Sequence, residues 1–109
     1  MEELIKNVID EEFSEEVLQS DKPVLVDFWA SWCMPCKMQG DVLRELAPDI
    51  AGKVKIVKVN VDESEKTALE YGITSIPTLM VFVCGELKEK TVGLTTKSEL
   101  SEMLIKYIG

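Results

Sequence analysis

Apolar residues recur along the chain in two patterns, one typical of strands and the other of helices. Short runs rich in β-branched and aromatic residues predict strands, and they cover residues 4–9, 24–29, 53–61 and 78–84. A tight connection at Gly85-Glu86 then predicts a hairpin with a fifth strand at residues 87–92. Apolar residues three or four positions apart predict helices, and they cover residues 10–19, the segment from the Cys33/Cys36 pair to residue 50, and residues 62–71 and 96–108.

Capping residues suggest where these helices begin. We expect Asp10 to be the N-cap of the first helix. Asp62 and Glu65 are spaced as a cap and its N3 partner for the third, and Thr96 and Glu99 have the spacing of a capping box for the last. Along the longest helix we expect the apolar positions four residues apart to be buried, namely Met38, Val42, Leu46 and Ile50.

The order of the elements predicts an α/β fold in one domain, residues 1–109. Strands that alternate with helices are joined by parallel crossovers, whereas the closing hairpin adds an antiparallel edge. We therefore expect a central mixed five-stranded sheet, with three parallel strands and an antiparallel hairpin, flanked by four helices. A near-continuous apolar strand such as residues 24–29 is buried on both faces, which places helices on both sides of the sheet.

Charge narrows the possible partners. The chain has 12 basic and 20 acidic residues, a net charge of −8, and both nucleic acid and anionic membranes require a basic surface. The acidic N-terminus lacks the pattern of a signal peptide, and no apolar run approaches the ~20 residues of a membrane span. The sequence thus predicts a cytoplasmic protein, a monomer in our interpretation, with neither nucleic acid nor membrane as partner.

Two of the three cysteines are candidates for chemistry. Cys33 and Cys36 are three residues apart after a buried strand, so in a first helical turn they lie on one face within disulfide reach. Pro35 suits that first turn, where its missing N–H is no loss. Unpaired N–H groups at a helix N-terminus stabilise a thiolate, which makes Cys33 the expected nucleophile and Cys36 the more buried partner.

Other interpretations of the cysteines are less favoured. Cys33 and Cys36 could be inert, or half of a zinc site, but zinc takes four ligands and the chain has no histidine and no second cysteine pair. The odd cysteine, Cys84, precedes Gly85 at the expected hairpin end, where we interpret it as a small filler residue. A regulatory or dimer-forming thiol is the alternative for Cys84.

The segment around the cysteines resembles the W-C-G-P-C-K motif of the thioredoxin family: it reads Phe28-Trp29-Ala30-Ser31-Trp32-Cys33-Met34-Pro35-Cys36-Lys37. Further segments resemble the family in the same order, at residues 10–13, 22–28, 57–62, 71–73, 75–78 and 92–93. The resemblance covers nearly the whole chain and implies the thioredoxin fold and a thiol–disulfide oxidoreductase.

The resemblance also implies roles for individual residues. Cys33 would attack a target disulfide and Cys36 would resolve the mixed disulfide. Asp27 would be a buried carboxylate that exchanges a proton with Cys36, and Lys58 would moderate its charge. An ion pair between Asp27 and Lys58 with no catalytic duty is the alternative from the residues alone.

The implied substrate surface surrounds Cys33. Ile76-Pro77 resembles the cis-proline loop of the family, which leaves backbone groups free to pair with an extended substrate. The surface would comprise Trp32, Met34, Pro35, Ile76, Pro77, Val92 and Gly93, while Trp29 would pack beneath the site. Met34 stands where the family most often has glycine, and its flexible thioether adds apolar area beside the nucleophile.

The implied partners are disulfide-containing target proteins and a thioredoxin reductase, either flavin-dependent or ferredoxin-linked. No bound cofactor and no metal are expected, only the redox-active pair itself. A specialised glutaredoxin-like, isomerase-type or oxidant-type protein with a retuned potential is one alternative. A binding or chaperone module on the same fold is another.

Overall fold

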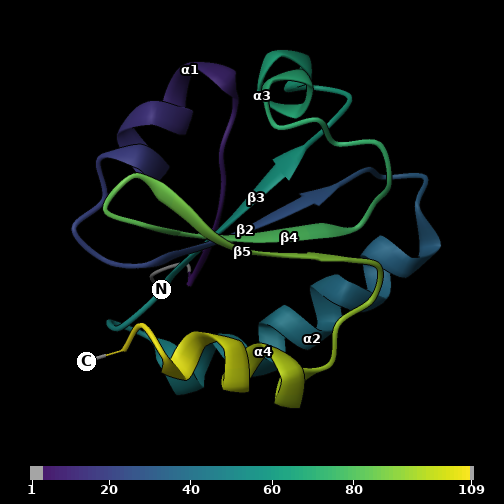
Figure 1. Cartoon of the computed structure of the whole chain (residues 1–109). Helices are drawn as coiled ribbons and strands as arrows, with labels where there is room; N and C mark the ends of the chain where they lie inside the picture. Colours follow the sequence, from purple (N-terminus) through teal and green to yellow (C-terminus); the bar gives the residue numbers. More distant parts are fainter. Residues whose placement is uncertain (1–3, 109) are drawn as a thin grey trace.

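The computed structural model describes residues 4–108, and a five-stranded mixed sheet lies at its centre (Figure 1). The strands are ordered β1-β3-β2-β4-β5 across the sheet. β1 (Ile5–Asn7), β2 (Val24–Trp29) and β3 (Lys55–Asn60) are parallel, whereas β4 (Thr78–Val83) and β5 (Glu86–Val92) are antiparallel additions. The predicted sheet, with three parallel strands and a closing hairpin, is confirmed.

Helices cover both faces of the sheet. α1 (Asp10–Phe13) continues into a π-helical segment, η1 (Ser14–Leu18), and lies with α3 (Glu65–Glu70) over one face. α2 (Met34–Ile50) and α4 (Lys97–Ile105) lie over the other. Figure 1 shows these two pairs above and below the strands, the layered arrangement that fully apolar strands require.

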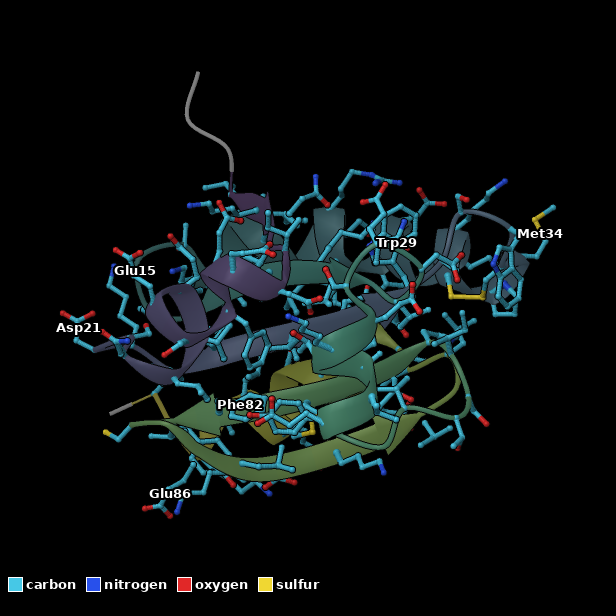
Figure 2. The ribbon with its side chains drawn as sticks, turned by 90° about the horizontal axis from the view of Figure 1, so that it is seen from above. Glu15, Asp21, Trp29, Met34, Phe82 and Glu86 are labelled. Carbon is cyan, nitrogen blue, oxygen red and sulfur yellow. A yellow bond between two sulfur atoms is a disulfide. The ribbon has the colours of Figure 1, made fainter. Side chains whose placement is uncertain are left out.

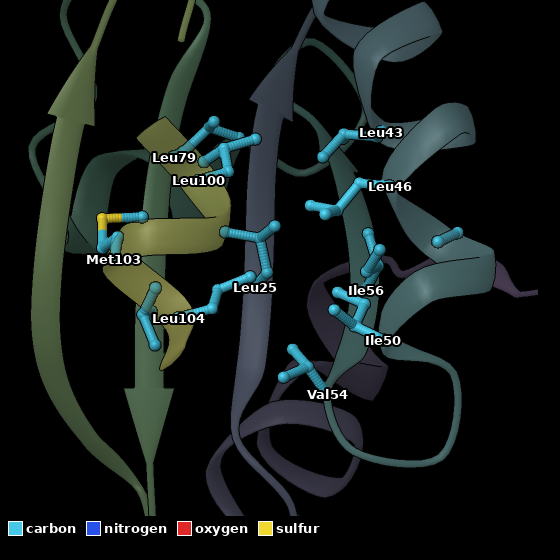
Figure 3. Packing of buried hydrophobic residues seen from close by; sticks show 12 residues of the cluster. Leu25, Leu43, Leu46, Ile50, Val54, Ile56, Leu79, Leu100, Met103 and Leu104 are labelled. Atoms are coloured by element: carbon cyan, nitrogen blue, oxygen red, sulfur yellow. The ribbon is translucent and has the colours of Figure 1, made fainter. Parts of the chain in front are cut away.

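Alternation along β2 divides the core into two clusters. Leu25 faces α2 and α4, where it packs with residues such as Leu43 and Leu104 (Figure 3). Val26 and Phe28 face the opposite side and pack with Phe13 and Phe82. Because successive strand residues point to opposite faces, Asp27 shares the face of Leu25 and therefore lies beneath α2.

Two of the predicted helix caps are wrong. Ile9 is the N-cap of α1, and the carboxylate of Asp10 instead accepts hydrogen bonds from the backbone N–H groups of Lys66 and Thr67 and from the Thr67 hydroxyl. Asp10 thus caps α3 from a distant part of the chain.

Ser64, rather than Asp62, is the N-cap of α3, so Glu65 is its first residue instead of N3. Thr96 and Glu99 do form the predicted capping box. The last helix is shorter than expected and ends at Ile105, although Ile108 still packs against the core.

The hairpin turn lies one residue earlier than predicted. Cys84 and Gly85 form it with φ angles of 52° and 81°, as a tight two-residue hairpin turn requires. Cys84 is exposed, so the expectation that it fills a small space is wrong.

The buried stripe of α2 also differs in phase from the prediction. Leu46 and Ile50 are buried as expected, but Met38 is 54% exposed and Gln39 is completely buried instead. Among residues 4–108, no helix has both the length and the apolar character needed to cross a membrane.

Candidate active site

The cysteine pair lies where β2 ends and α2 begins. Cys33 is the N-cap of α2 and has extended backbone, so the helix starts at Met34, with Pro35 in its first turn. Cys33 and Cys36 are joined by a disulfide with their Cα atoms 5.2 Å apart. The backbone N–H of Cys36 donates to Sγ of Cys33 at 3.2 Å, a contact that favours negative charge on this sulfur when the bond is reduced.

The two sulfurs differ in accessibility. Cys33 is 5% exposed and Cys36 is 1% exposed. Cys36 lines a small groove together with Trp29, Gly40 and Lys58. Cys33 therefore lies nearer the surface, and Cys36 is the more buried of the two, as predicted.

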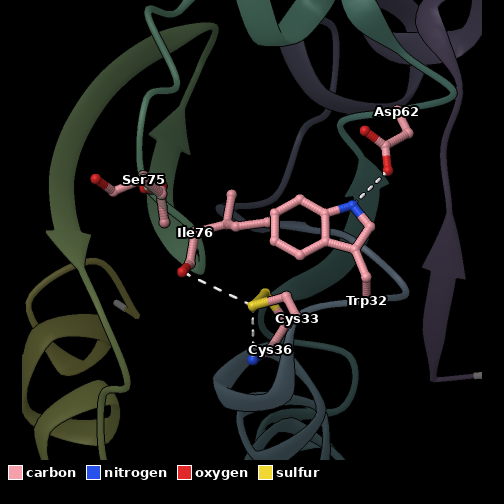
Figure 4. The surroundings of a disulfide bond; sticks show 7 residues. Trp32, Cys33, Cys36, Asp62, Ser75 and Ile76 are labelled. Atoms are coloured by element: carbon pink, nitrogen blue, oxygen red, sulfur yellow. Dashed lines mark hydrogen bonds between the residues drawn. A yellow bond between two sulfur atoms is a disulfide. The ribbon is translucent and has the colours of Figure 1, made fainter.

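The loop before β4 faces Cys33. The Ile76–Pro77 peptide bond is cis, and the carbonyl oxygen of Ile76 lies 3.8 Å from Sγ of Cys33 (Figure 4). Pro77 is buried, and its carbonyl accepts a hydrogen bond of 2.8 Å from the N–H of Gly93. The sequence-predicted residues Ile76, Pro77 and Gly93 are thus brought together with the cysteine pair.

Exposed apolar side chains lie around the disulfide and the loop that faces it. Trp32, Met34 and Val92 are 70%, 69% and 59% exposed. Figure 2 shows Met34 and the disulfide together at one end of the molecule, with Glu15 and Asp21 at the other. Single exposed apolar residues are ordinary, but several around one reactive bond are typical of a docking surface.

Trp32 is held by a residue that the sequence interpretation did not assign to the site. Its indole N–H donates to the carboxylate of Asp62 at 2.9 Å (Figure 4). Asp62 was expected to cap α3, because the sequence signal for a local cap is strong while a partner 30 residues away leaves no pattern. This bond fixes the orientation of a side chain that is otherwise largely in solvent.

Asp27 is a buried carboxylate without a hydrogen-bond partner. It is fully buried, and neither of its oxygens is hydrogen-bonded within the described part of the chain. Burial raises the pKa of Asp27 to about 7, and the positive charge of Lys58 opposes this rise. Asp27 can therefore accept or release a proton near neutral pH.

Lys58 is near Asp27 but is not its ion-pair partner. The two residues are register partners on β2 and β3, while the Lys58 ammonium lies 4.2 Å from the centre of the Trp29 ring. Within residues 4–108 the ion pairs involve other residues. Trp29 in turn packs against the cluster of Ala30, Cys33 and Cys36, beneath the site.

Comparison with known proteins identifies the family. The thioredoxin family model matches residues 4–106. The chain belongs to the thioredoxin family. Three relatives illustrate the similarity: thioredoxin of Rickettsia conorii is 50% identical over 105 residues, covering 96% of this chain and 100% of the relative; thioredoxin 1 of Nostoc sp. is 52% identical over 101 residues, covering 93% and 94%; and thioredoxin of Pseudomonas aeruginosa is 49% identical over 104 residues, covering 95% and 96%.

Membership of the thioredoxin family establishes the class of reaction. The chain is a thiol–disulfide oxidoreductase that reduces disulfide-containing substrates and is itself re-reduced by a thioredoxin reductase. The redox-active group is the Cys33–Cys36 disulfide, and thioredoxins need no bound cofactor. Among residues 4–108, no group of three or more metal-ligating side chains is arranged to hold an ion.

Proposed function

We propose that Cys33 is the nucleophile and Cys36 the resolving residue in the reduction of protein disulfides. The Cys33 thiolate attacks one sulfur of the target disulfide, and the other target sulfur leaves as a thiolate. The Cys36 thiol then loses its proton and attacks Sγ of Cys33, which releases the second target sulfur. The target gains two electrons, and the cysteine pair becomes a disulfide.

The observation that carries this assignment is the position of Cys33 at the N-cap of α2. Its sulfur accepts the Cys36 N–H and faces the Ile76 carbonyl, so it combines stabilisation of negative charge with access to a substrate backbone. Cys36 lies one turn further into the helix and is the more buried sulfur. These differences support distinct roles for the two thiols.

Asp27 serves in this proposal as the proton acceptor for Cys36. Its raised pKa, about 7, matches the pH at which a resolving thiol must be deprotonated. Lys58 keeps that pKa from rising further. The lack of an ion pair between the two residues supports a titrating Asp27 over the alternative of a fixed structural pair.

In this proposal the substrate surface surrounds Cys33. An extended target segment would pair with the backbone of Ile76, beside cis-Pro77, in a strand-addition mode. Apolar side chains of the target would contact Trp32, Met34, Pro35, Val92 and Gly93.

We place the protein in the cytoplasm as a monomeric domain formed by residues 1–109. A chain of net charge −8 repels copies of itself, and its three cysteines supply no disulfide framework of the kind typical of secreted domains. Sedimentation equilibrium would check the monomer directly.

Trapping of mixed disulfides tests the roles of the cysteines. Cys36→Ser should accumulate a covalent complex with a model protein disulfide, because the first attack proceeds and resolution does not. Cys33→Ser should not accumulate it. All variants should also carry Cys84→Ser, which removes the exposed third thiol. The protein with Cys84→Ser alone is the matched control. Equal trapping by both variants would contradict the assignment.

A further inference from the structure

A buried glutamine connects the active-site helix to the loop that follows β5. Gln39 is completely buried, and its side-chain amide pairs with both backbone groups of Thr95. The Gln39 Nε2 group donates to the Thr95 carbonyl at 3.0 Å, and the Thr95 N–H donates to Gln39 Oε1 at 2.8 Å. We call this pair of bonds the Gln39–Thr95 bridge.

The bridge joins two walls of the substrate surface. Gln39 lies three residues after Cys36, hence on the same face of α2. Thr95 lies two residues after Gly93, whose carbonyl accepts from the Thr95 hydroxyl at 3.2 Å. Gly93 in turn donates to the carbonyl of cis-Pro77, so an unbroken path runs from the cysteine pair through Gln39 to the loop that faces Cys33.

The segment beside this bridge, residues 92–95, is held to β4 and β5 by the Val92–Thr78 pairing, the Gly93 N–H bond to Pro77 and the Thr91–Thr95 hydroxyl contact, but its side chains on the substrate side are free of the core. Val92 is 59% exposed and Leu94 is 45% exposed, so both side chains extend largely into solvent. Gly93 has a φ of 90°, a conformation that glycine adopts without a steric penalty. The two backbone bonds of Thr95 to Gln39 connect this segment directly to α2.

We propose that Gln39 is a positioning residue that sets the distance between the Cys33–Cys36 pair and residues 92–95, and thereby the separation of two sides of the proposed substrate surface. Gln39 touches neither substrate nor sulfur in this role. It acts through Thr95 and Gly93 on the wall that a bound target segment contacts. The inference rests on the proposed substrate surface and adds to it the residue that holds one of its walls.

The test compares two substrates in Gln39→Met, a variant of similar side-chain volume that cannot make either bond. A protein disulfide must contact the proposed substrate surface on both sides of Cys33, whereas 2-hydroxyethyl disulfide needs only access to Cys33. We expect kcat/KM for the protein disulfide to fall about fivefold, mainly through KM, a factor equivalent to one net hydrogen bond. The rate constant for 2-hydroxyethyl disulfide and the reduction potential should stay unchanged.

Two further variants make the comparison specific. Gln39→Glu keeps an acceptor for the Thr95 N–H but loses the donor to the Thr95 carbonyl. Its kcat/KM for the protein disulfide should therefore lie between those of wild type and Gln39→Met. Thr67→Val is the matched control, because it breaks another buried hydrogen bond, to Asp10, at a site remote from the cysteines. Thr67→Val should leave kcat/KM for the protein disulfide and the rate constant for 2-hydroxyethyl disulfide unchanged at temperatures where all variants are folded. Faster amide hydrogen exchange at Thr95 would verify that the bridge has opened.

The outcomes separate this inference from the proposed function. An equal loss with both substrates in Gln39→Met, or no loss despite faster Thr95 exchange, would overturn the positioning role alone. If Gln39→Met does not fold, Gln39→Glu decides by the same comparison of substrates. If wild-type protein reduces 2-hydroxyethyl disulfide but does not reduce the protein disulfide, the proposed substrate surface fails, and the role of Gln39 fails with it.

Discussion

Asp27 and Lys58 occupy paired positions on neighbouring parallel strands without forming an ion pair. Their register is fixed by the β2–β3 pairing, and both lie on the sheet face covered by α2. The ammonium of Lys58 lies over the Trp29 ring, while both oxygens of Asp27 lack a partner among the described residues. Burial raises the pKa of the Asp27 carboxyl to about 7, and the nearby positive charge of Lys58 opposes this rise. At neutral pH the carboxyl group is therefore partly protonated.

Replacing Asp27 should separate the two chemical steps. In Asp27→Asn we expect the first attack by Cys33 to keep its rate and resolution by Cys36 to slow by at least about tenfold, since a positioned general base typically contributes about 10²–10⁴. Stopped-flow kinetics that follow the formation and decay of the mixed disulfide measure both steps. Glu45→Gln, which changes an exposed carboxylate further along α2, is the control. Unchanged rates in both steps would remove Asp27 from the mechanism.

The stability of the oxidised protein should depend on pH through the same group. Asp27 has a pKa of about 7 when folded, against 3.8 for the ordinary carboxyl, so between these values the folded state holds a proton that the unfolded state has released. The stabilising contribution of the neutral form is fully present below about pH 3.8 and is lost as the pH rises to about 7. The full difference between 3.8 and about 7 corresponds to roughly 4 kcal/mol.

Denaturant unfolding of wild type and Asp27→Asn across this pH range provides the measurement. The two proteins should have similar pH dependence of the free energy of unfolding near pH 4 and below. From there to about pH 7 the variant should become progressively more stable relative to wild type. Beyond that pH the difference should stay constant. A difference that does not change with pH would show that Asp27 keeps the same charge in the folded and unfolded states.

Much of the fold could be predicted from the sequence because its signals are local. Alternating strands and helices imply parallel crossovers, and a tight two-residue connection implies a hairpin, so the mixed sheet could be predicted from element order. The CxxC spacing after a buried strand likewise predicts the disulfide at a helix start. These features depend on residues that are close together in the sequence, so a local sequence pattern is enough to predict them. The strand order β1-β3-β2-β4-β5 is not part of the prediction, because it depends on pairing between strands far apart in the chain.

Several of the failed predictions concern side chains whose partners are distant in sequence. Asp10 and Asp62 have the residue type of local caps, yet they bind Thr67 and Trp32, 57 and 30 residues away. On α2, the apolar Met38 faces solvent and the polar Gln39 is buried, because Gln39 finds backbone partners in Thr95 while Met38 lies one turn after the exposed Met34. In the sequence, the only sign of the bond between Gln39 and Thr95 is a polar residue four positions before the apolar Leu43 on the same helix face.

The cap that Asp10 provides to α3 predicts a stability defect without a catalytic one. Asp10→Ala removes acceptors from the N–H groups of Lys66 and Thr67, which should lower the free energy of unfolding by about 1–2 kcal/mol. Reductase activity at temperatures where the variant is folded should stay at the wild-type level. Thermal unfolding is the measurement, with Glu11→Ala, an exposed neighbour, as control. A similar loss in both variants would mean that general helix charge, rather than the α3 cap, is responsible.

The bond from Trp32 to Asp62 predicts a defect confined to protein substrates. Trp32 is 70% exposed, so without the Asp62 carboxylate its indole ring should sample several rotamers and lose part of the binding free energy to ordering on contact. Asp62→Ala should therefore raise KM for a protein disulfide by about two- to fivefold, equivalent to one weakened hydrogen bond, and leave reduction of a small disulfide unchanged.

The Trp32 indole N–H offers a direct check of that explanation. In Asp62→Ala its exchange with solvent, followed by NMR, should accelerate, whereas Glu63→Ala, the adjacent exposed carboxylate, should leave exchange and KM as they are. Conversely, a raised KM in Asp62→Ala without faster indole exchange would mean that Asp62 contacts the target itself. Its charge, and not the orientation of Trp32, would then determine which acidic or basic segments can dock beside Cys33.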